Sequence, residues 1–590
     1  MTLCADVLRH LMVLEDIDHV NLHERLSNLV YGERKSACTN MVRLPFKLPT
    51  ERFHILNIHL ERLPSAFSGA QGATRWSNKD LDPVRRENRK WGIAALIAYW
   101  ISDAFNSINL ELGSSILAIG LSWKDAIGTV ALGFLIISVV INLNGATGAL
   151  YHAPFPVLAR AGWGFWGSYV AIVSRIILAL CWFAVFTANG GTFVQVMITA
   201  IWPSFGKLKN TIPADQGITS AGMVSFFIFW LIELPFLYMS PNSLRWLFIT
   251  KSIIVPIAYI AILIWAFRTT GGTGGPLLAS DAKATVTGST YSYAWLSSMT
   301  SMSGTFSTIS VNMPDFTRYT KSNVRWMWLY VPMLPTIFTF VAFIGIAATS
   351  AGQEKYGSLD WNTADLIGHW DNRACQFFVG FACALAALGS NISANSISAA
   401  NDLAAISPSY FNIRRGQLTC AFFAWVLVPW KILATASGFL NFMSAYSIFF
   451  GPIAAILVLD FWWLHRAKYD VVALYHPDSI YRYAYGINFR ALAAFIVGIA
   501  PNFPGFVNSI NSSIDVGVGK RPYTFAYILG FVITSLVYAV LSSIWKPTRS
   551  LIEKAVLPDE VYDGKIEVEG SEEVGETSQG MEKGSHLRGA

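Results

Sequence analysis

Long apolar stretches alternate with short polar connections between residues 91 and 545 of this chain. A helix needs roughly 20 apolar residues to cross a bilayer, so this pattern predicts about twelve transmembrane helices. We expect them near residues 91–120, 125–143, 164–200, 221–239, 246–267, 293–313, 326–348, 376–400, 418–436, 439–463, 488–508 and 523–545. The predicted fold class is an all-α polytopic membrane protein.

The first predicted span has two apolar ends and a polar centre. That centre contains Asp103, Asn106, Asn109 and Glu111. A charged side chain at the centre of a membrane helix costs roughly 3 kcal/mol on insertion scales, so it rarely occurs there without a function. Two half-helices that meet at an unwound polar centre can form the substrate and ion site of a transporter. We predict a broken helix of this kind here.

A second polar span follows five spans later. Residues 293–313 are rich in Ser and Thr, with Gly304 near the middle. Interrupted spans in matching positions of two halves indicate an inverted repeat with a binding site at its centre. The pattern therefore favours a secondary transporter.

The composition agrees with a membrane protein and disfavours other classes. Of the 590 residues, 53% are hydrophobic and 14% are charged, whereas soluble proteins have about 25% charged residues. The net charge of +6 is spread out, so nucleic acid is not an expected partner. The six cysteines show no metal-ligand spacing, and we expect no metal site and no cofactor. There is no zinc-protease helix, nucleophile elbow or phosphate-binding glycine loop, so we expect no catalytic residues and no enzyme.

Three regions are predicted along the chain. Residues 1–90 form an N-terminal tail that is disordered or loosely docked, residues 91–545 form the transporter domain, and residues 546–590 form an acidic C-terminal tail expected to be disordered. The positive-inside rule places both tails in the cytosol, because the short basic loops then lie inside. We expect a multi-pass protein of the plasma membrane. The candidate ubiquitination sites for trafficking are Lys554, Lys565 and Lys583.

Several motifs, in a fixed order along the chain, make the functional assignment more specific. They are NKDLDPV (78–84), AYWISDAFN (98–106), GLSW (120–123), GALYHAPFPVLARAGWGFWGS (148–168), NMPDFTRYTKS (312–322), GSNISANSISAANDLAAISPSYFNIRRGQ (389–417) and FFGPIAAILVLDFWW (449–463). Together they resemble the fungal uracil/allantoin/uridine/thiamine permease branch of the nucleobase–cation symporter family. The resemblance implies a LeuT-type five-plus-five inverted repeat with two additional C-terminal helices. It also implies proton coupling and alternating access, in which spans 1, 2, 6 and 7 rock against spans 3, 4, 8 and 9.

The resemblance also assigns the substrate-binding residues. Trp182 matches the family's stacking aromatic in the third span, and Phe186 stands where the family has a Gln. This departure removes an amide and suggests a less polar or differently substituted ligand. Phe306 matches the second aromatic. Asn395 matches the ligand-binding Asn, with Asn391 four residues earlier on the same helical face.

Other polar residues are candidates for ion coupling and gating. Sodium-coupled relatives use hydroxyls of the eighth span, where Ser390 alone is left here, and this favours protons. Asp103 is the first candidate for the proton carrier, beside Asn106 and ahead of Glu111 and Glu233. The expected gating residues are Asp315, Arg318, Lys251 and Asp402 on the inside and Met443 on the outside.

The sequence thus predicts a symporter that imports a nucleobase-like or related nitrogen heterocycle of the uracil, allantoin or uridine class together with protons. Two alternatives stay open at this point. One is a carrier of the thiamine or nicotinamide-riboside type, which the missing Gln keeps open. The other is a nutrient sensor with the same fold that binds its ligand without net transport. The expected partners are the small heterocyclic substrate, the lipid bilayer and the ubiquitin-dependent trafficking machinery.

Overall fold

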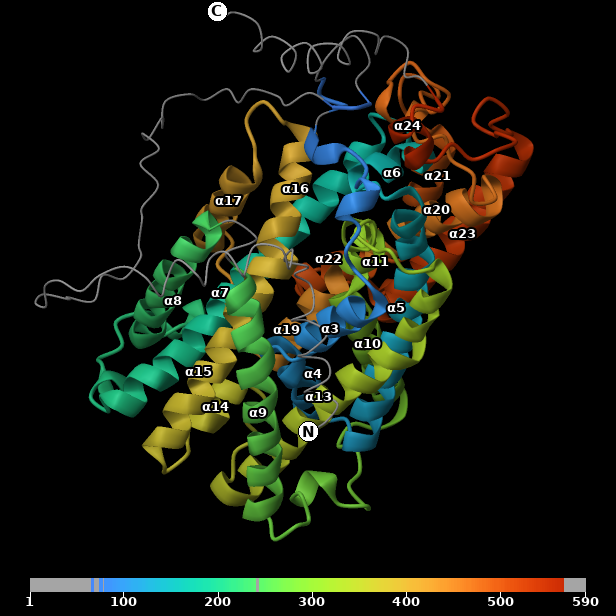
Figure 1. Ribbon diagram of the computed structural model, residues 1–590. Helices are drawn as coiled ribbons and strands as arrows, with labels where there is room; N and C mark the ends of the chain where they lie inside the picture. The colour runs from blue at the N-terminus through green and yellow to red at the C-terminus, as the bar shows by residue number, and fades with distance from the viewer. Residues whose placement is uncertain (1–64, 68–73, 78, 240–243, 567–590) are drawn as a thin grey trace, which may run out of the picture. The chain divides into compact units, whose positions relative to one another are not determined.

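A bundle of long helices makes up the transporter domain (Figure 1). The computed structural model describes residues 65–67, 74–77, 79–239 and 244–566. The unbroken long helices are α5 (Trp123–Tyr151), α7 (Ser168–Ile201), α8 (Ser220–Tyr238), α9 (Arg245–Thr269), α13 (Tyr330–Tyr356) and α23 (Ala526–Ile544).

Other spans are assembled from shorter pieces. Helix α15 (Arg373–Ser390) continues through the π-helical turn η8 (Asn391–Ser396) into α16 (Ile397–Ile406). One further span is formed by α19 (Ala436–Ala445), α20 (Ser447–Leu459) and the π-helical turn η9 (Asp460–Leu464). Among the described residues, eight segments are long and apolar enough to cross a membrane, and they coincide with eight of the predicted spans. The bent pair α21 (Phe489–Ile499) and α22 (Phe503–Ile510) would make a ninth. The total of twelve stays a prediction.

The first predicted break occurs at Phe105 and Asn106, between α3 (Ile93–Ala104) and α4 (Ser107–Ala118). Asn106 caps α4, because its side-chain oxygen accepts a hydrogen bond from the backbone N–H of Asn109 at 2.8 Å. Its side-chain nitrogen donates to the carbonyl oxygen of Asp103 at 2.7 Å. The Asn106 amide therefore hydrogen-bonds to backbone groups on both sides of the break. These backbone groups would be costly to bury without partners.

The second break occurs at Phe306, between α10 (Gly288–Thr305) and α11 (Ser307–Asn312). It lies two residues beyond Gly304, where the sequence placed the centre of this span. Gly304 instead allows close helix packing, since a Cβ atom there would lie 2.0 Å from the carbonyl oxygen of Met443.

A glycine on α13 holds the first broken helix in place. A Cβ atom at Gly345 would lie 1.8 Å from the carbonyl oxygen of Leu110 on α4. We expect Gly345→Ala to destabilise the protein by about 1–3 kcal/mol, because backbone must move apart to admit the methyl group. The measurement is the melting temperature of the detergent-purified protein. Gly368→Ala is the control, because nothing lies within 4 Å of its Cβ position; an equal melting temperature for both variants would contradict the close contact.

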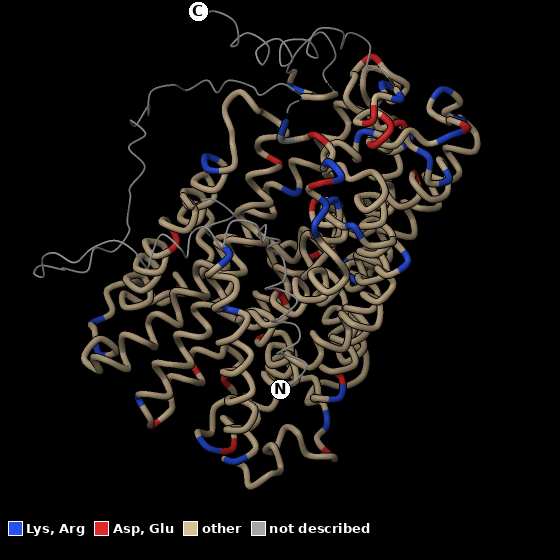
Figure 2. Tube along the Cα trace, in the orientation of Figure 1, with Lys and Arg blue, Asp and Glu red and all other residues tan. Residues whose placement is uncertain are grey.

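Parts of both tails pack against one end of the bundle. Trp76 and Leu81 are buried there, and the hydroxyl of Tyr475 donates to the carbonyl oxygen of Leu81 at 2.6 Å. Arg89 donates to Asp559 of the C-terminal segment at 2.5 Å. The described part of the N-terminal tail therefore docks through defined contacts. The prediction of disorder or loose docking for residues 1–90 falls mostly outside the described residues. The acidic stretch 567–583 lies outside the described residues. Figure 2 shows charged positions gathered toward the ends of the helices, with few in between.

The contact between the tails depends on the charge of Asp559. Burial raises the pKa of this carboxyl. Hydrogen bonds from Arg89 and Arg86 lower the pKa by more than burial raises it, so the pKa is below its usual value. A lowered pKa means that the stabilisation is present above the usual pKa of 3.8 and is lost as the pH falls through the lowered value. Asp559→Asn mimics this loss at neutral pH.

We expect Asp559→Asn to speed hydrogen exchange of residues 83–89 and 556–562 up to roughly fivefold, as for the loss of one partly exposed ion pair. Asp563→Asn is the control, since the Asp563 carboxylate forms its ion pair with the exposed Lys565 and not with Arg89. Unchanged exchange in Asp559→Asn would show that the ion pair does not hold the tails.

Candidate substrate site

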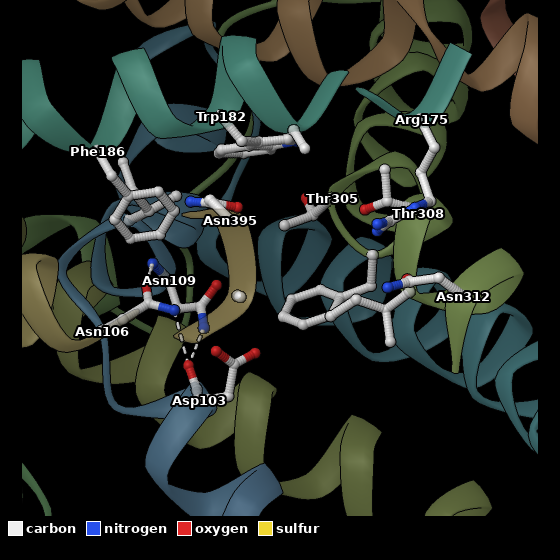
Figure 3. A pocket seen from close by; sticks show the side chains of 15 residues that line it. Asp103, Asn106, Asn109, Arg175, Trp182, Phe186, Thr305, Thr308, Asn312 and Asn395 are labelled. Atoms are coloured by element: carbon white, nitrogen blue, oxygen red, sulfur yellow. Dashed lines mark hydrogen bonds between the residues drawn. The ribbon is translucent and has the colours of Figure 1, made fainter. Parts of the chain in front are cut away.

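A pocket lies where the two broken helices face α7 and the π-helical turn η8 (Figure 3). The half-helices α3 and α4 contribute Asp103, Asn106 and Asn109, and the second break contributes Thr305 and Phe306. The other walls come from α7 and η8. Both predicted breaks thus open onto one cavity in the interior of the bundle, and this placement makes it the candidate substrate site.

One wall of the pocket is aromatic. Trp182 and Phe186 lie one turn apart on α7, and both line the pocket. The indole N–H of Trp182 donates to the hydroxyl of Tyr446 at 3.2 Å, and the Trp182 ring packs edge-on against Phe442 with ring centroids 5.1 Å apart. These contacts fix the indole, which offers a surface on which a planar ring can stack.

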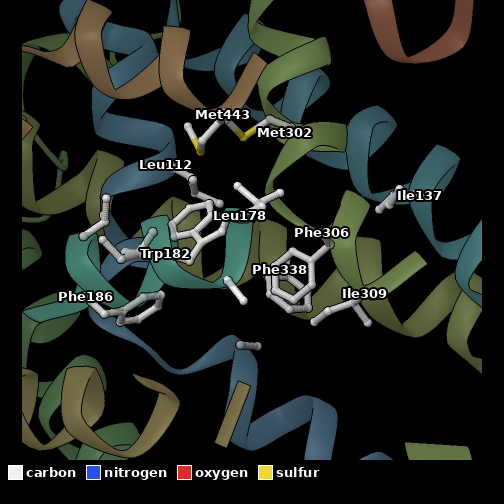
Figure 4. Packing of buried hydrophobic residues seen from close by; sticks show 14 of the residues in the cluster. Leu112, Ile137, Leu178, Trp182, Phe186, Met302, Phe306, Ile309, Phe338 and Met443 are labelled. Carbon is white, nitrogen blue, oxygen red and sulfur yellow. The ribbon is translucent and has the colours of Figure 1, made fainter. Parts of the chain in front are cut away.

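Phe306 forms a second aromatic element at the break between α10 and α11. Its ring packs against Phe338 at a centroid distance of 4.8 Å and against Phe134 at 5.4 Å. Figure 4 shows Phe306 beside Phe338, in the same buried cluster as Trp182 and Phe186. Packing of this kind anchors the break and leaves Phe306 at the edge of the pocket.

The polar wall comes from η8. Asn395 lines the pocket, and its side-chain nitrogen donates to the side-chain oxygen of Asn391 at 3.0 Å. Asn391 is fully buried behind it and donates in turn to Glu233 on α8 at 2.7 Å. The two asparagines are therefore neighbours, as their spacing predicted, but only Asn395 reaches the pocket.

The predicted ion-coupling residues lie in separate places. Asp103 lines the pocket and interacts electrostatically with Lys251 of α9. The ammonium group of Lys251 donates to the hydroxyl of Ser390 at 2.7 Å. Glu111 lies elsewhere, where it accepts hydrogen bonds from Asn189 at 3.2 Å and from the backbone N–H of Thr363 at 3.3 Å. Lys251, which the sequence suggested as a gating residue, is thus a buried neighbour of two ion-coupling candidates.

Asp315 and Arg318, two of the predicted inner-gate residues, form hydrogen bonds with different partners. Asp315 accepts a hydrogen bond from the backbone N–H of Phe155 at 2.8 Å, at the start of α6 (Phe155–Trp163). Arg318 donates to the hydroxyl of Tyr319 at 2.9 Å. On the opposite side, the sulfur of Met443 accepts a hydrogen bond from the pocket residue Thr305 at 3.1 Å. Met443 therefore lies directly behind the pocket wall.

Arg175 is a site residue that the sequence reasoning missed. It lines the pocket from α7 and forms a buried ion pair with Asp402 of α16. It also donates to the carbonyl oxygen of Ser398 at 2.7 Å. The signal was available, because an arginine within an apolar span is rare and usually functional or paired.

The fold and the pocket define a multi-pass membrane transporter in which two broken helices enclose a central site. Residues 83–530 match the family described as permease for cytosine/purines, uracil, thiamine, allantoin. This chain belongs to that permease family.

Curated relatives agree with this assignment. The allantoin permease and the uracil permease of Saccharomyces cerevisiae are each 34% identical over 79% of this chain and 75% of their own length. The uridine permease of the same yeast is 31% identical over 86% of this chain and 82% of its own length. The family members with such names are permeases, not enzymes.

A solved structure shares the fold. Mhp1, a nucleobase-cation-symport-1 family transporter solved in a closed conformation with bromovinylhydantoin bound, superposes with a TM-score of 0.66. The match covers 83% of this chain and 99% of Mhp1 at 18% identity. The LeuT-type five-plus-five fold predicted from the sequence is thereby confirmed.

Proposed function

We propose that this protein is a secondary active symporter that imports a nitrogen heterocycle of the uracil, allantoin or uridine class together with protons, by alternating access. The observation that carries the proposal is the pocket between the two breaks, where Trp182 offers a ring surface and Asn395 an amide. A planar heterocycle needs both, a face to stack on and a polar group that reads its edge. The names of the yeast relatives support this substrate class.

Proton coupling is supported by the surroundings of Ser390. The hydroxyl that a sodium site would use accepts a hydrogen bond from Lys251, so a cation of the protein already occupies this position. Asp103 is the proposed proton carrier because it both lines the pocket and interacts electrostatically with that lysine. Asn106 holds the break beside it. We propose Asp315 and Arg318 as inner-gate residues and Met443 as part of the outer gate.

The rest of the proposal concerns the cell. We propose a plasma-membrane location with both termini in the cytosol, and no cofactor, metal or nucleic-acid partner. The tails would contact the ubiquitin-dependent trafficking machinery. Transport rather than catalysis is the proposed activity.

A second candidate substrate class is a cationic ring of the thiamine or nicotinamide-riboside type. Two observations favour it: the carboxyl group of Asp103 lines the pocket, and Phe186 supplies no amide. The nicotinamide riboside transporter 1 of Saccharomyces cerevisiae is 27% identical over 78% of both chains.

Uptake by yeast that lacks its own uracil, allantoin, uridine and thiamine carriers tests these proposals. The cells express this chain and receive labelled uracil, allantoin, uridine, thiamine or nicotinamide riboside at two external pH values. Accumulation of one of the first three, stronger at acid pH, is the expected result. Accumulation of thiamine or nicotinamide riboside would favour the second class. Surface-localised protein without uptake of any compound would contradict transport of this panel and favour a sensor.

A further inference from the structure

A carboxyl group outside the pocket is connected to it through side-chain hydrogen bonds. Glu233 is fully buried on α8, and its Oε1 accepts a hydrogen bond from Asn391 Nδ2 at 2.7 Å. Asn391 Oδ1 accepts in turn from Asn395 Nδ2 at 3.0 Å, and Asn395 lines the pocket. Three side chains therefore run from α8 to the pocket wall.

The direction of these hydrogen bonds is set at Asn391. Its Nδ2 faces two acceptors, Glu233 Oε1 at 2.7 Å and the carbonyl oxygen of Phe183 at 3.1 Å, and also the hydroxyl of Thr187 at 3.2 Å, which can donate or accept. An amide nitrogen only donates and an amide oxygen only accepts. Turning the Asn391 amide around would place its oxygen against both acceptors. Asn391 must therefore present its oxygen to Asn395, and Asn395 must use its nitrogen to reach it.

This direction decides what Asn395 offers to a ligand. One of its two N–H groups is donated to Asn391. Its side-chain oxygen stays on the pocket side as an acceptor. An amide oxygen recognises an N–H donor and not a carbonyl group. Phe186, which also lines the pocket, has no polar group with which to compensate.

We propose that Glu233 is a positioning residue that holds the Asn395 oxygen toward the pocket through Asn391, and thereby selects heterocycles with a ring N–H at that edge. The inference rests on the proposed function, because it takes Asn395 as the amide that reads the substrate. It names a chemical feature of the substrate, the N–H group, that the family match does not supply.

The arrangement works whether or not Glu233 carries a proton. Its Oε2 accepts from Thr187 Oγ1 at 2.8 Å, and that hydroxyl also lies 2.9 Å from the carbonyl oxygen of Phe183. A proton on Oε2 can be donated to Thr187 while the Thr187 hydrogen turns to Phe183. In both cases Oε1 accepts from Asn391. Cys420 on α17 (Ile413–Val426) is the titratable group that interacts with Glu233. None of the ion pairs among the described residues includes Glu233.

Positioning and proton carrying predict opposite results for one substitution. Glu233→Gln keeps a side-chain oxygen that accepts from Asn391. The Gln nitrogen takes the place of the protonated Oε2 and donates to the Thr187 hydroxyl. Glu233→Met has a similar length but no acceptor. A positioning role therefore requires that Gln preserves function and Met does not, whereas a proton carrier would be lost in both.

The experiment measures uptake of labelled uracil in the carrier-deficient yeast, with unlabelled uracil, 1-methyluracil and 3-methyluracil as competitors. In the wild type, at least one methylated compound should compete about tenfold more weakly than uracil, since its N–H is gone. Glu233→Gln should keep this discrimination, the KM and the pH dependence. Glu233→Met, and Asn391→Ser as a second variant, should raise the KM about tenfold and lose most of the discrimination while the surface amount stays equal. Ser225→Ala is the control on α8, because its hydroxyl bonds only within the helix.

Several outcomes would overturn the proposal. If 1-methyluracil and 3-methyluracil both compete as strongly as uracil in the wild type, the site does not recognise a ring N–H. Loss of concentrative uptake in Glu233→Gln would assign Glu233 to proton coupling instead. Unchanged KM and discrimination in Glu233→Met would show that Asn391 and Asn395 need no support from α8.

If the wild type takes up none of the panel compounds, the proposed function fails. The melting temperatures of the purified variants then still test whether Glu233 holds Asn395 through Asn391. The effects of Glu233→Met and Asn395→Ala should be non-additive if the two residues act through one hydrogen-bonded chain. Additive effects would overturn the positioning role as well.

Discussion

Asn395→Ala is expected to reduce substrate uptake roughly 10- to 100-fold while the protein still reaches the cell surface. Asn395 is the amide of η8 that lines the pocket. Its removal leaves a substrate polar group without a partner and also leaves the oxygen of Asn391 without its donor. Unpaired polar groups in a water-poor site cost more than the bond itself contributes, which is why the expected loss is large.

The control for this variant is Ser393→Ala in the same π-helical turn. The Ser393 hydroxyl donates back to the carbonyl oxygen of Gly389 at 3.0 Å, so its loss should leave uptake within about twofold. Initial uptake rates over a range of substrate concentrations, divided by surface amount, give KM and maximal rate for each variant. Equal uptake in Asn395→Ala and Ser393→Ala would remove Asn395 from the site.

Arg175→Met is expected to destabilise the protein by about 3–5 kcal/mol, the usual cost of leaving one partner of a buried ion pair alone. Arg175 and Asp402 are both buried and pair between α7 and α16. The substitution leaves the Asp402 carboxylate uncompensated in the interior. The melting temperature and the monodispersity of the detergent-purified protein report this loss.

Two further variants make the result specific. Arg482→Met breaks an exposed pair with Asp478 and should cost about 0–1 kcal/mol. The double variant Arg175→Met with Asp402→Leu should recover much of the lost stability, because an apolar pair of similar volume avoids the buried charge. A double variant as unstable as Arg175→Met would show that the cost comes from packing and not from the unpaired carboxylate.

Much of the architecture was predictable because it depends on local patterns. The long apolar spans follow from the hydrocarbon thickness of a bilayer. Both breaks were predictable because polar residues within a span need partners that a continuous helix does not provide. The family motifs then identified Trp182, Phe306 and Asn395, and the structure places all three on the pocket.

Other features depend on which residues meet after folding, so the sequence did not determine them. Arg175 and Asp402 are far apart in the chain and pair only because α7 packs beside α16. The sequence suggested no partner for Arg89 or Asp559, which meet at one end of the bundle although they lie in opposite tails of the chain.

The sequence by itself determined that this protein is a helical membrane transporter with two broken helices, because hydrophobicity and helix-breaking polarity are properties of a segment. The tertiary structure alone decided how the polar groups are paired. From the sequence, Glu233 was a candidate proton carrier within a span. Its position opposite Asn391, which directs the Asn395 amide, comes from the structure alone. The physical reason is that the direction of a hydrogen bond depends on the donors and acceptors that surround it, and here they come from three different helices.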